Sequence, residues 1–318
     1  MKPLFGALSS TALVLLLGAT VSATPVLVST RYLMVYVDGD KRQTATAGPS
    51  TGNYHLLGTM PDGSILLTYD DANGTSVAAI SPGVGARTLK AFPRVVPPSF
   101  IAASSDGFVA YDAGVQLLRR YDLQGSAVGS PIAPSGPRDA LGIGEFVVVA
   151  GNGRLAEWDR GGRLRHEAIL DGGPLVALSA DRFAVIDNVD REVRVYDTNL
   201  DLKARMRFPA RPPRALAAGP DGSLAILTGT PSCVGSDAEV VVYDDPTASS
   251  PRARIQQNVA TAIGLGLGKD EVYVADAGCQ RDDDGSIAVF GRDGSAHTVI
   301  GNIGSPTGVL PVSSPASK

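Results

Sequence analysis

The sequence holds few of the residues that usually build catalytic centres. Its 318 residues include two cysteines, three histidines and one tryptophan, and no basic run occurs along it. Its formal net charge of −4 and its pI near 5.4 make it a poor partner for nucleic acid or an anionic lipid surface. After residue 23, no stretch repeats apolar residues at the helical i, i+3, i+4, i+7 spacing over three turns. Helix is therefore nearly excluded.

The first 23 residues have the layout of a secretory signal peptide. Lys2 precedes the apolar run ALVLLLGA, and small residues, Val21 and Ala23, stand at the −3 and −1 positions. The run is shorter than the roughly 20 residues of a membrane-spanning helix, and no cysteine follows it for a lipid anchor. A buried N-terminal helix is the alternative. We expect residues 24–318 to be one exported domain, periplasmic or extracellular, with no membrane anchor.

Turn-forming residues are abundant, and they separate the strands of a repeating unit. The chain has 37 glycines and 22 prolines, which suits many short strands. Strand-like runs end at Tyr121, Trp158, Tyr196, Tyr243 and Phe290, spaced by 37, 38, 47 and 47 residues. Asp-Gly pairs at 62–63, 106–107 and 221–222 predict hairpins. A repeat of about 40 residues with four strands is typical of a β-propeller blade.

We therefore predict an all-β propeller of four-stranded antiparallel blades. Six blades are expected near residues 53–92, 96–133, 136–170, 173–209, 212–257 and 259–300. Residues 26–47 read as two or three further strands and residues 305–312 as one. Together they predict a seventh blade closed by both ends of the chain, which would remove two free sheet edges. Six blades with an N-terminal extension is the alternative, and the protein is expected to be a monomer.

Two segments resemble known repeats. FAVIDNVDREVRVYDTNLDL (183–202) and VYVADAG with GSIAVFGRDGS (272–278 and 285–295) look like NHL-type and related six-bladed propeller repeats. The resemblance implies the architecture and no specific member, because scaffolds, lyases and lactonases share such repeats.

The enzymes of this class show patterns that the chain lacks. Related lactonases place a glutamate on a first strand of a blade, whereas no glutamate here precedes Glu145 and none falls on a first strand. Quinone-dependent propeller dehydrogenases carry a tryptophan in nearly every blade, and this chain has only Trp158. The histidines fall on two outermost strands (His166, His297) and one first strand (His55), so they cannot share one zinc. A catalytic cluster is therefore unsupported.

Aspartates recur where second strands end. Asp112, Asp187 and Asp276 stand in register, and Asp70 lies two residues further along its blade. A ring of such acids on one face of the propeller is a candidate cation site. The alternative, which we favour, is that each carboxylate accepts backbone N–H bonds from the turn that follows it.

Arginines lie in the connections between blades. Arg94, Arg138, Arg211 and Arg214 stand mostly beside prolines. In a propeller these connections share a face with the loops that hold the aspartates. Arginine and aspartate together on one face predict a site for an anionic or zwitterionic ligand. Pairing among these charges, or simple solvation, is the alternative.

The two cysteines occupy matched loops of neighbouring blades. Cys233 and Cys279 lie 10 and 11 residues before the aromatic residue of the next strand, in loops longer than those of earlier blades. In an exported protein this favours a disulfide.

A run of acids follows the second cysteine. Its members, Asp282, Asp283 and Asp284, are consecutive, so at most two, such as Asp282 and Asp284, can converge on Ca²⁺. Calcium is thus a minor hypothesis, and no other cofactor is predicted.

These observations favour a binding role. The expected function is that of an exported propeller that binds a protein, a peptide or a small polar ligand. The alternative is a metal-dependent, lactonase-like hydrolase or a lyase with its site at the propeller axis.

Overall fold

The structure, a computed structural model, describes most of the chain after residue 24. The described ranges are 25–30, 34–38, 41–45, 53–60, 63–81, 85–94, 98–104, 106–279, 285–301, 303–304 and 306–312. Within them the regular elements are strands, β1 to β28. No helix in this part of the chain is long and apolar enough to cross a bilayer.

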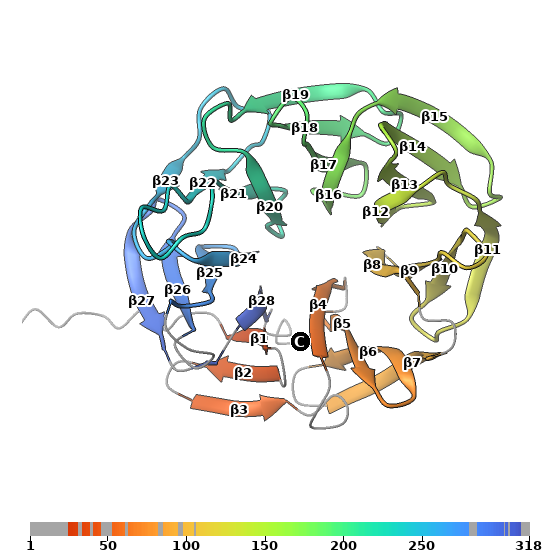
Figure 1. Cartoon of the computed structure of the whole chain (residues 1–318). Coiled ribbons are helices and arrows are strands. Elements are labelled where there is room, and N and C mark those ends of the chain that lie inside the picture. Colours follow the sequence, from red (N-terminus) through yellow and green to blue (C-terminus); the bar gives the residue numbers. More distant parts are fainter. Residues whose placement is uncertain are drawn as a thin grey trace, which may run out of the picture.

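The strands form radial blades, each with an innermost first strand and an outermost fourth strand (Figure 1). The first two blades along the chain are β4 (Asn53–Thr59), β5 (Ile65–Asp71), β6 (Gly74–Ser81) and β7 (Gly85–Pro93), then β8 (Phe100–Ser104), β9 (Gly107–Asp112), β10 (Leu117–Asp122) and β11 (Ala127–Ile132). The next two are β12 (Pro137–Ile143), β13 (Phe146–Gly151), β14 (Arg154–Asp159) and β15 (Leu164–Ile169), then β16 (Gly172–Ala177), β17 (Arg182–Asp187), β18 (Glu192–Asp197) and β19 (Leu202–Arg207).

Three more blades complete the ring. They are β20 (Pro213–Ala218), β21 (Leu224–Thr228), β22 (Glu239–Tyr243) and β23 (Ala253–Ile255), then β24 (Ala262–Leu267), β25 (Glu271–Asp276), β26 (Ser286–Gly291) and β27 (Ala296–Ile300), and finally β28 (Pro306–Pro311) with β1 (Val26–Thr30), β2 (Met34–Asp38) and β3 (Lys41–Ala45). A single parallel bridge, Gly142 to Ser104, joins β12 to β8 and links two blades into one eight-stranded sheet. The boundaries follow those expected from the repeat within a few residues.

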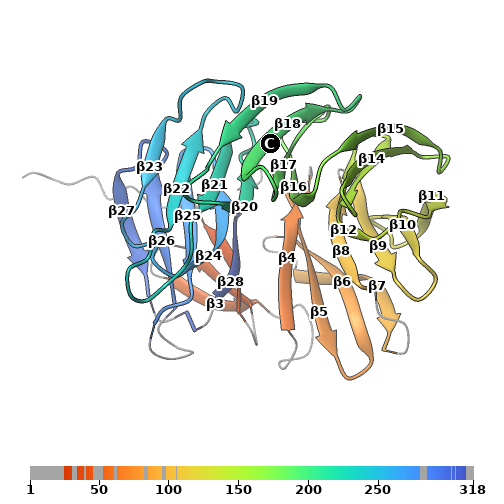
Figure 2. The ribbon, with the colours of Figure 1, turned by 45° about the horizontal axis from the view of Figure 1, so that its top comes forward.

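The two ends of the chain share one blade. Strand β28 pairs antiparallel with β1, with Val26 opposite Pro311 and Val28 opposite Val309. Strand β28 also lies beside β4 of the first blade (Figure 2). The expected all-β propeller, with a blade made of three N-terminal strands and one C-terminal strand, is confirmed.

The core lies between the blades, because both faces of each sheet are covered. Val193 and Val195 of β18 pack against Leu224 and Val241 of the next blade. Tyr196, the next residue after Val195, packs toward the preceding blade, in line with the two-residue period of a strand. This explains why runs such as EVVVY (239–243) are almost wholly apolar.

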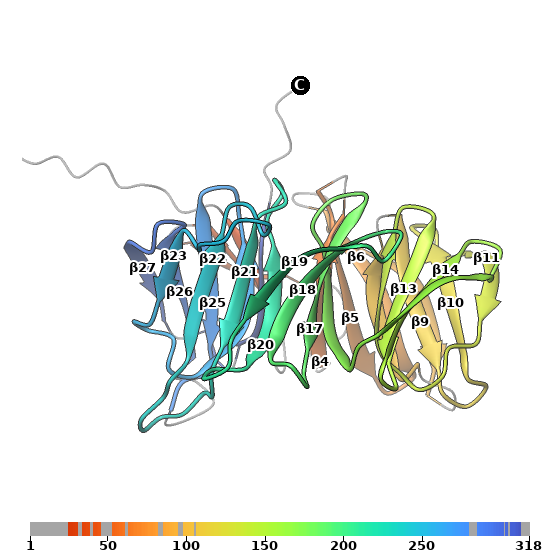
Figure 3. The same ribbon diagram turned by 90° about the horizontal axis from the view of Figure 1, so that it is seen from above.

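The wheel has two distinct faces, seen edge-on in Figure 3. First strands begin, second strands end, third strands begin and fourth strands end on one of them. We call this the loop face, because it carries the second-to-third-strand loops and the interblade connections. The other, the turn face, carries the first-to-second and third-to-fourth-strand turns. In Figure 3 the long loop between β21 and β22 projects from the lower edge, so the loop face points down there.

Buried arginines fasten neighbouring blades together on the turn face. The Arg120 Nη2 lies 2.7 Å from Asp106 Oδ1 of its own blade and 2.6 Å from the carbonyl oxygen of Gly144 in the next. Arg292 repeats this arrangement, at 2.7 Å from Asp221 Oδ2 of the preceding blade and 2.5 Å from the carbonyl oxygen of Gly268. Hydrogen bonds from Arg292 hold the pKa of Asp221 well below its usual range, despite partial burial. Both aspartates belong to the Asp-Gly hairpins of the repeat, which thus also serve as arginine acceptors.

Candidate functional site

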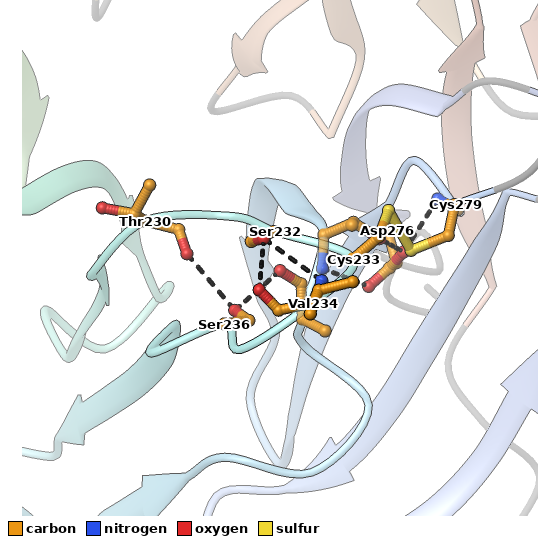
Figure 4. The surroundings of a disulfide bond; sticks show 10 residues. Thr230, Ser232, Cys233, Val234, Ser236, Asp276 and Cys279 are labelled. Atoms are coloured by element: carbon orange, nitrogen blue, oxygen red, sulfur yellow. Dashed lines mark hydrogen bonds between the residues drawn. A yellow bond between two sulfur atoms is a disulfide. The ribbon is translucent and has the colours of Figure 1, made fainter.

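The two cysteines are joined across neighbouring blades (Figure 4). Cys233 lies in the loop after β21 and Cys279 in the loop after β25, with Cα atoms 5.5 Å apart. Both residues are exposed on the loop face. The predicted disulfide is present, and it closes an interval of 46 residues.

Hydrogen bonds hold the Cys233 loop against the adjoining interblade connection (Figure 4). The Ser236 hydroxyl donates to the carbonyl oxygens of Thr230 at 3.3 Å and Ala260 at 2.9 Å. The Ser232 amide also donates to the Ala260 carbonyl oxygen, at 3.0 Å. At the tip, next to the disulfide, the Val234 residue is 88% exposed. The loop therefore presents an aliphatic side chain from a fixed backbone.

Exposed aliphatic residues concentrate on this face. Ile169 at the end of β15 is 91% exposed, Val189 in the β17–β18 turn 71%, and Val115 in the β9–β10 turn 58%. With Val234, they give four successive blades one strongly exposed β-branched residue each. The remaining exposed large apolar residues of the described chain are Ile263 at the start of β24, Leu164 and Leu202 on the turn face, and Val299 on the outer strand β27.

The aspartates predicted at second-strand ends hold turns. Asp112 Oδ1 accepts the amide of Gly114 at 2.8 Å, and Asp276 Oδ1 accepts that of Gly278 at 2.9 Å. Asp70 Oδ1 accepts the hydroxyl of Thr75 across the β5–β6 hairpin at 2.7 Å. These bonds favour the structural interpretation over a cation ring.

Asp187 belongs to a denser cluster. Its Oδ1 accepts the Val189 amide at 3.0 Å, while oxygens of Asp187, Asp190 and Glu192 all lie within 4.8 Å of one another. The guanidinium of Arg194 fills the centre, at 2.6 Å from each aspartate and 2.5 Å from Glu192. Burial acts to lower the pKa of Arg194, but hydrogen bonds to Tyr196 and Glu192 and the Asp187 charge raise it above its usual value. The Arg194 guanidinium thus occupies the position among these three acids that a metal ion would take.

Two of the four predicted arginines form an ion pair with a described carboxylate, and two do not. Arg138 Nη1 lies 2.7 Å from Asp171 Oδ1, and Arg211 Nη1 lies 3.3 Å from Glu239 Oε2. Arg94 is exposed and has no ion pair with any described residue.

Arg214 also lacks an ion pair within the described ranges, and its Nη2 donates to the Ala262 carbonyl oxygen of the next blade at 3.0 Å. Its buried Nε has no hydrogen-bond partner among the described residues, and burial lowers its pKa although the Asp237 charge opposes this. Arg94 and Arg214 are therefore the two candidates that form no ion pair with a described residue.

The described innermost strands carry few charged or histidine side chains. These are His55, Arg138, Asp139 and Arg214, all within the first three residues of their strands and hence at the loop face. Sequence reasoning missed Asp139, although an acid within the first strand PRDALGI is a usable signal. Its Oδ2 accepts the Leu175 amide of the next blade at 2.9 Å. Burial raises its pKa to about 6, against the lowering effect of its backbone hydrogen bonds.

The other candidate ligands do not converge. His166 and His297 lie on the outer strands β15 and β27, and His297 Nδ1 is 3.3 Å from Glu271 Oε1. The calcium candidates Asp282 and Asp284 lie outside the described residues.

A rim groove of about 300 Å³ lies between β23 and the β24–β27 blade. Its lining includes the polar side chains of Arg254, Gln256 and Gln257 and the ring of Phe290. Arg254 and Gln256 already bind Glu239 at 2.8 and 3.0 Å. This groove is at the small end of the range for ligand pockets.

Comparison with known proteins identifies the fold. No protein-family model and no curated protein sequence matches the chain. Among solved structures, AztD of Citrobacter koseri superposes with a TM-score of 0.58 at 12% identity, covering 94% of this chain and 100% of AztD. A streptogramin B lyase gives 0.56 at 15% identity, with 90% and 91% covered. A protein from Lactobacillus plantarum gives 0.60 at 13% identity, with 90% and 98% covered.

At such low identity the similarity concerns the fold alone. The chain is a β-propeller whose structural neighbours include a lyase, AztD and WD40 domains. The choice between binding and catalysis has to come from the chain's own residues.

Proposed function

We propose that the protein is an exported binding protein that presents its loop face to a protein, a peptide or a small polar ligand. The single observation that carries the proposal is the row of exposed aliphatic residues on that face, one from each of four successive blades. Contiguous exposed apolar surface marks interaction sites, and we infer that these four residues contribute to such a surface on the loop face. Arg94 and Arg214, which form no ion pair with a described carboxylate, add donors for an anionic or zwitterionic group.

The order of the loop supports this proposal. Binding costs less free energy when the contacting groups are already fixed, because less conformational entropy is lost. The disulfide and the Ser236 hydrogen bonds fix the loop that carries Val234. The other residues proposed for this face, Asp70, Asp112, Asp187 and Asp276, would act by shaping the turns from which the aliphatic residues project.

Export is the second part of the proposal. Disulfides persist in oxidising compartments, which agrees with the signal-peptide layout of residues 1–23. N-terminal sequencing of the protein recovered from its native host checks this. A mature chain that starts near residue 24 is expected, and an intact Met1 on the bulk of the protein contradicts export by this route.

The enzymatic alternative has less support. A metal-dependent hydrolase or lyase needs several carboxylates or amides that converge on the axis. The described innermost strands supply one carboxylate, Asp139, and the backbone of the next blade occupies it. Metal analysis of the purified protein tests the alternative, because a stoichiometric divalent metal would favour it.

The binding role is tested by affinity capture with two matched variants. The loop-face variant is Val189→Asp/Val234→Asp, and its control is the turn-face variant Leu164→Asp/Leu202→Asp. Each replaces two exposed apolar residues by aspartate. The wild type and the control are expected to retain the same bound species from an extract of the native host, and the loop-face variant to lose it. Equal capture by all three proteins would overturn the proposal.

A further inference from the structure

A second charged surface lies on the rim, at the boundary between the β4–β7 and β8–β11 blades. Its members are Arg87 and Lys90 on β7, Arg94 directly after β7, and Arg119 on β10. The pairing of Lys90 with Val77 and of Arg87 with Ala79 places both on one side of their sheet. Val77 packs with Tyr121 of the next blade, so this side faces that blade.

Arg119 approaches the same boundary from the other blade. It is paired with Ala110 and lies two residues before Tyr121, on the same side of β10, and both Ala110 and Tyr121 pack toward the β4–β7 blade. The Arg119 charge lowers the pKa of Tyr121 against a larger raising effect of burial, which agrees with this proximity. We call Arg87, Lys90, Arg94 and Arg119 the rim strip.

No residue of the rim strip has an ion pair with a described residue, whereas the basic residues of other outer strands do. On β19, Lys203 pairs with Asp197 at 2.6 Å and Arg207 with Glu192 at 3.4 Å. On β23, Arg254 pairs with Glu239 at 2.8 Å. The rim strip therefore leaves four positive charges unmatched within the described chain.

Two of these side chains are nevertheless held in place. Arg87 Nη2 donates to the Leu123 carbonyl oxygen at 3.0 Å. Lys90 Nζ lies 5.5 Å from the centroid of the Tyr121 ring, a cation–π distance. Tyr121 is itself fixed between Phe92 and Phe108, at ring-centroid distances of 5.8 and 4.9 Å. The charges of Arg87 and Lys90 are thus positioned before any ligand arrives, which lowers the entropy lost on binding.

We propose that the rim strip is a docking site for a short acidic peptide segment of a partner protein, separate from the aliphatic residues of the loop face and sharing only Arg94 with the loop-face donors. Guanidinium groups match carboxylates in shape and charge, and three of the four cations are arginines. From Arg87 to Arg94 the strand advances roughly 23 Å, about the length of seven extended residues.

The surrounding charge limits the length of the ligand. Asp71 and Asp112 stand at the loop-face end of these strands and Asp122 at the turn-face end. With a net charge of −4, the protein as a whole repels a long polyanion such as a sulfated polysaccharide. A short segment with a few carboxylates avoids that repulsion, and we therefore favour a peptide.

The test uses the full mature protein and a fluorescent decapeptide of alternating Glu and Thr, with binding followed by anisotropy at low ionic strength. The variant is Arg87→Gln/Lys90→Gln/Arg119→Gln. The matched control is Arg163→Gln/Arg182→Gln/Lys269→Gln, which removes three cations without described ion pairs from the turn-face ends of other blades.

The rim-strip variant is expected to raise the Kd about tenfold or more, and the control less than about twofold. The single variant Arg119→Gln, at an exposed position, is expected to change the Kd in the same direction by a smaller factor. Equal weakening by the control, equal affinity for a Gln/Thr peptide, or binding of a sulfated polysaccharide fragment in place of the peptide would each overturn the proposal.

Discussion

The two faces of the wheel use the same residue types for different ends. On the turn face, Arg120 and Arg292 are buried and bind an aspartate and a backbone carbonyl across a blade boundary. On the loop face, Arg94 and Arg214 have no described carboxylate partner, and aliphatic residues project into solvent. The arginines of the turn face join neighbouring blades, while the loop face exposes cationic and aliphatic side chains to solvent. Changes on the turn face should therefore alter stability alone, and changes on the loop face should alter binding.

The disulfide is the one device that should affect both properties. Its replacement in Cys233→Ser/Cys279→Ser frees an interval of 46 residues in the unfolded chain. The entropic account predicts a loss of about 4 kcal/mol in the free energy of unfolding. Urea denaturation measures this loss, and the captured species should also bind more weakly. A variant as stable as the wild type, with undiminished binding, would show that the disulfide contributes to neither property.

Glu157 lies in the middle of β14, away from both faces, and it bears on the pH dependence of stability. The residue is 1% exposed, and its Oε2 has no hydrogen-bond partner among the described residues. Burial raises its pKa from about 4.5 to about 7, against the opposing Arg165 charge and with help from Asp197. Because the folded state then holds the proton more tightly than the unfolded state, stability is lost as the pH rises through about 7.

Glu157→Gln removes that pH dependence, because glutamine does not ionise. At about pH 8 the variant should be more stable than the wild type by up to about 3 kcal/mol, and below about pH 4.5 the two should agree. Chemical denaturation across this pH range measures the difference. The control Glu145→Gln, at an exposed pair with Arg160, should leave the profile unchanged. A wild-type profile that is flat between these pH values would contradict the account of Glu157.

Arg292→Ala tests the turn face alone. The substitution leaves the Gly268 carbonyl oxygen and Asp221 without their shared donor, and we expect it to cost about 2 kcal/mol, since Asp221 is half exposed. The control Arg252→Ala breaks an exposed pair with Asp244 and should cost less than about 0.5 kcal/mol. Binding at the loop face should be the same in both variants. A loss of binding in Arg292→Ala without unfolding would contradict the idea that turn-face residues affect stability alone.

Val234→Ala should have the smallest effect on stability. The residue is 88% exposed, so its truncation should change the free energy of unfolding by less than about 0.5 kcal/mol. Binding should still weaken, because the side chain is a proposed contact. Thermal unfolding and capture efficiency, measured on the same preparation, separate these two effects.

Much of the architecture could be predicted from the repeat. The aromatic residues at third-strand ends, from Tyr121 to Phe290, marked the blades, and matched loop positions identified Cys233 and Cys279 as partners. These features are local, or recur with a fixed period, so one sequence suffices to find them. The capping role of Asp112 and Asp276 was also foreseeable, because aspartate before a turn commonly accepts its amides.

Contacts between blades could not be predicted in the same way. They depend on how adjacent sheets pack together. Examples are the hydrogen bond from Arg120 to the Gly144 carbonyl oxygen, the one from the Leu175 amide to Asp139, and the burial of Glu157. The repeat fixes the register within a sheet but carries no information about that offset. Arg138 and Arg214 look alike in sequence, yet only Arg138 forms an ion pair with a described carboxylate.

The assignment of binding to the loop face can be tested by hydrogen–deuterium exchange on the complex with the captured species. We expect slower exchange in residues 229–238 and in the turns around Val115 and Val189, with no change in the turns around Gly144 and Gly268. Protection of the turn-face turns, with the loops unchanged, would contradict it.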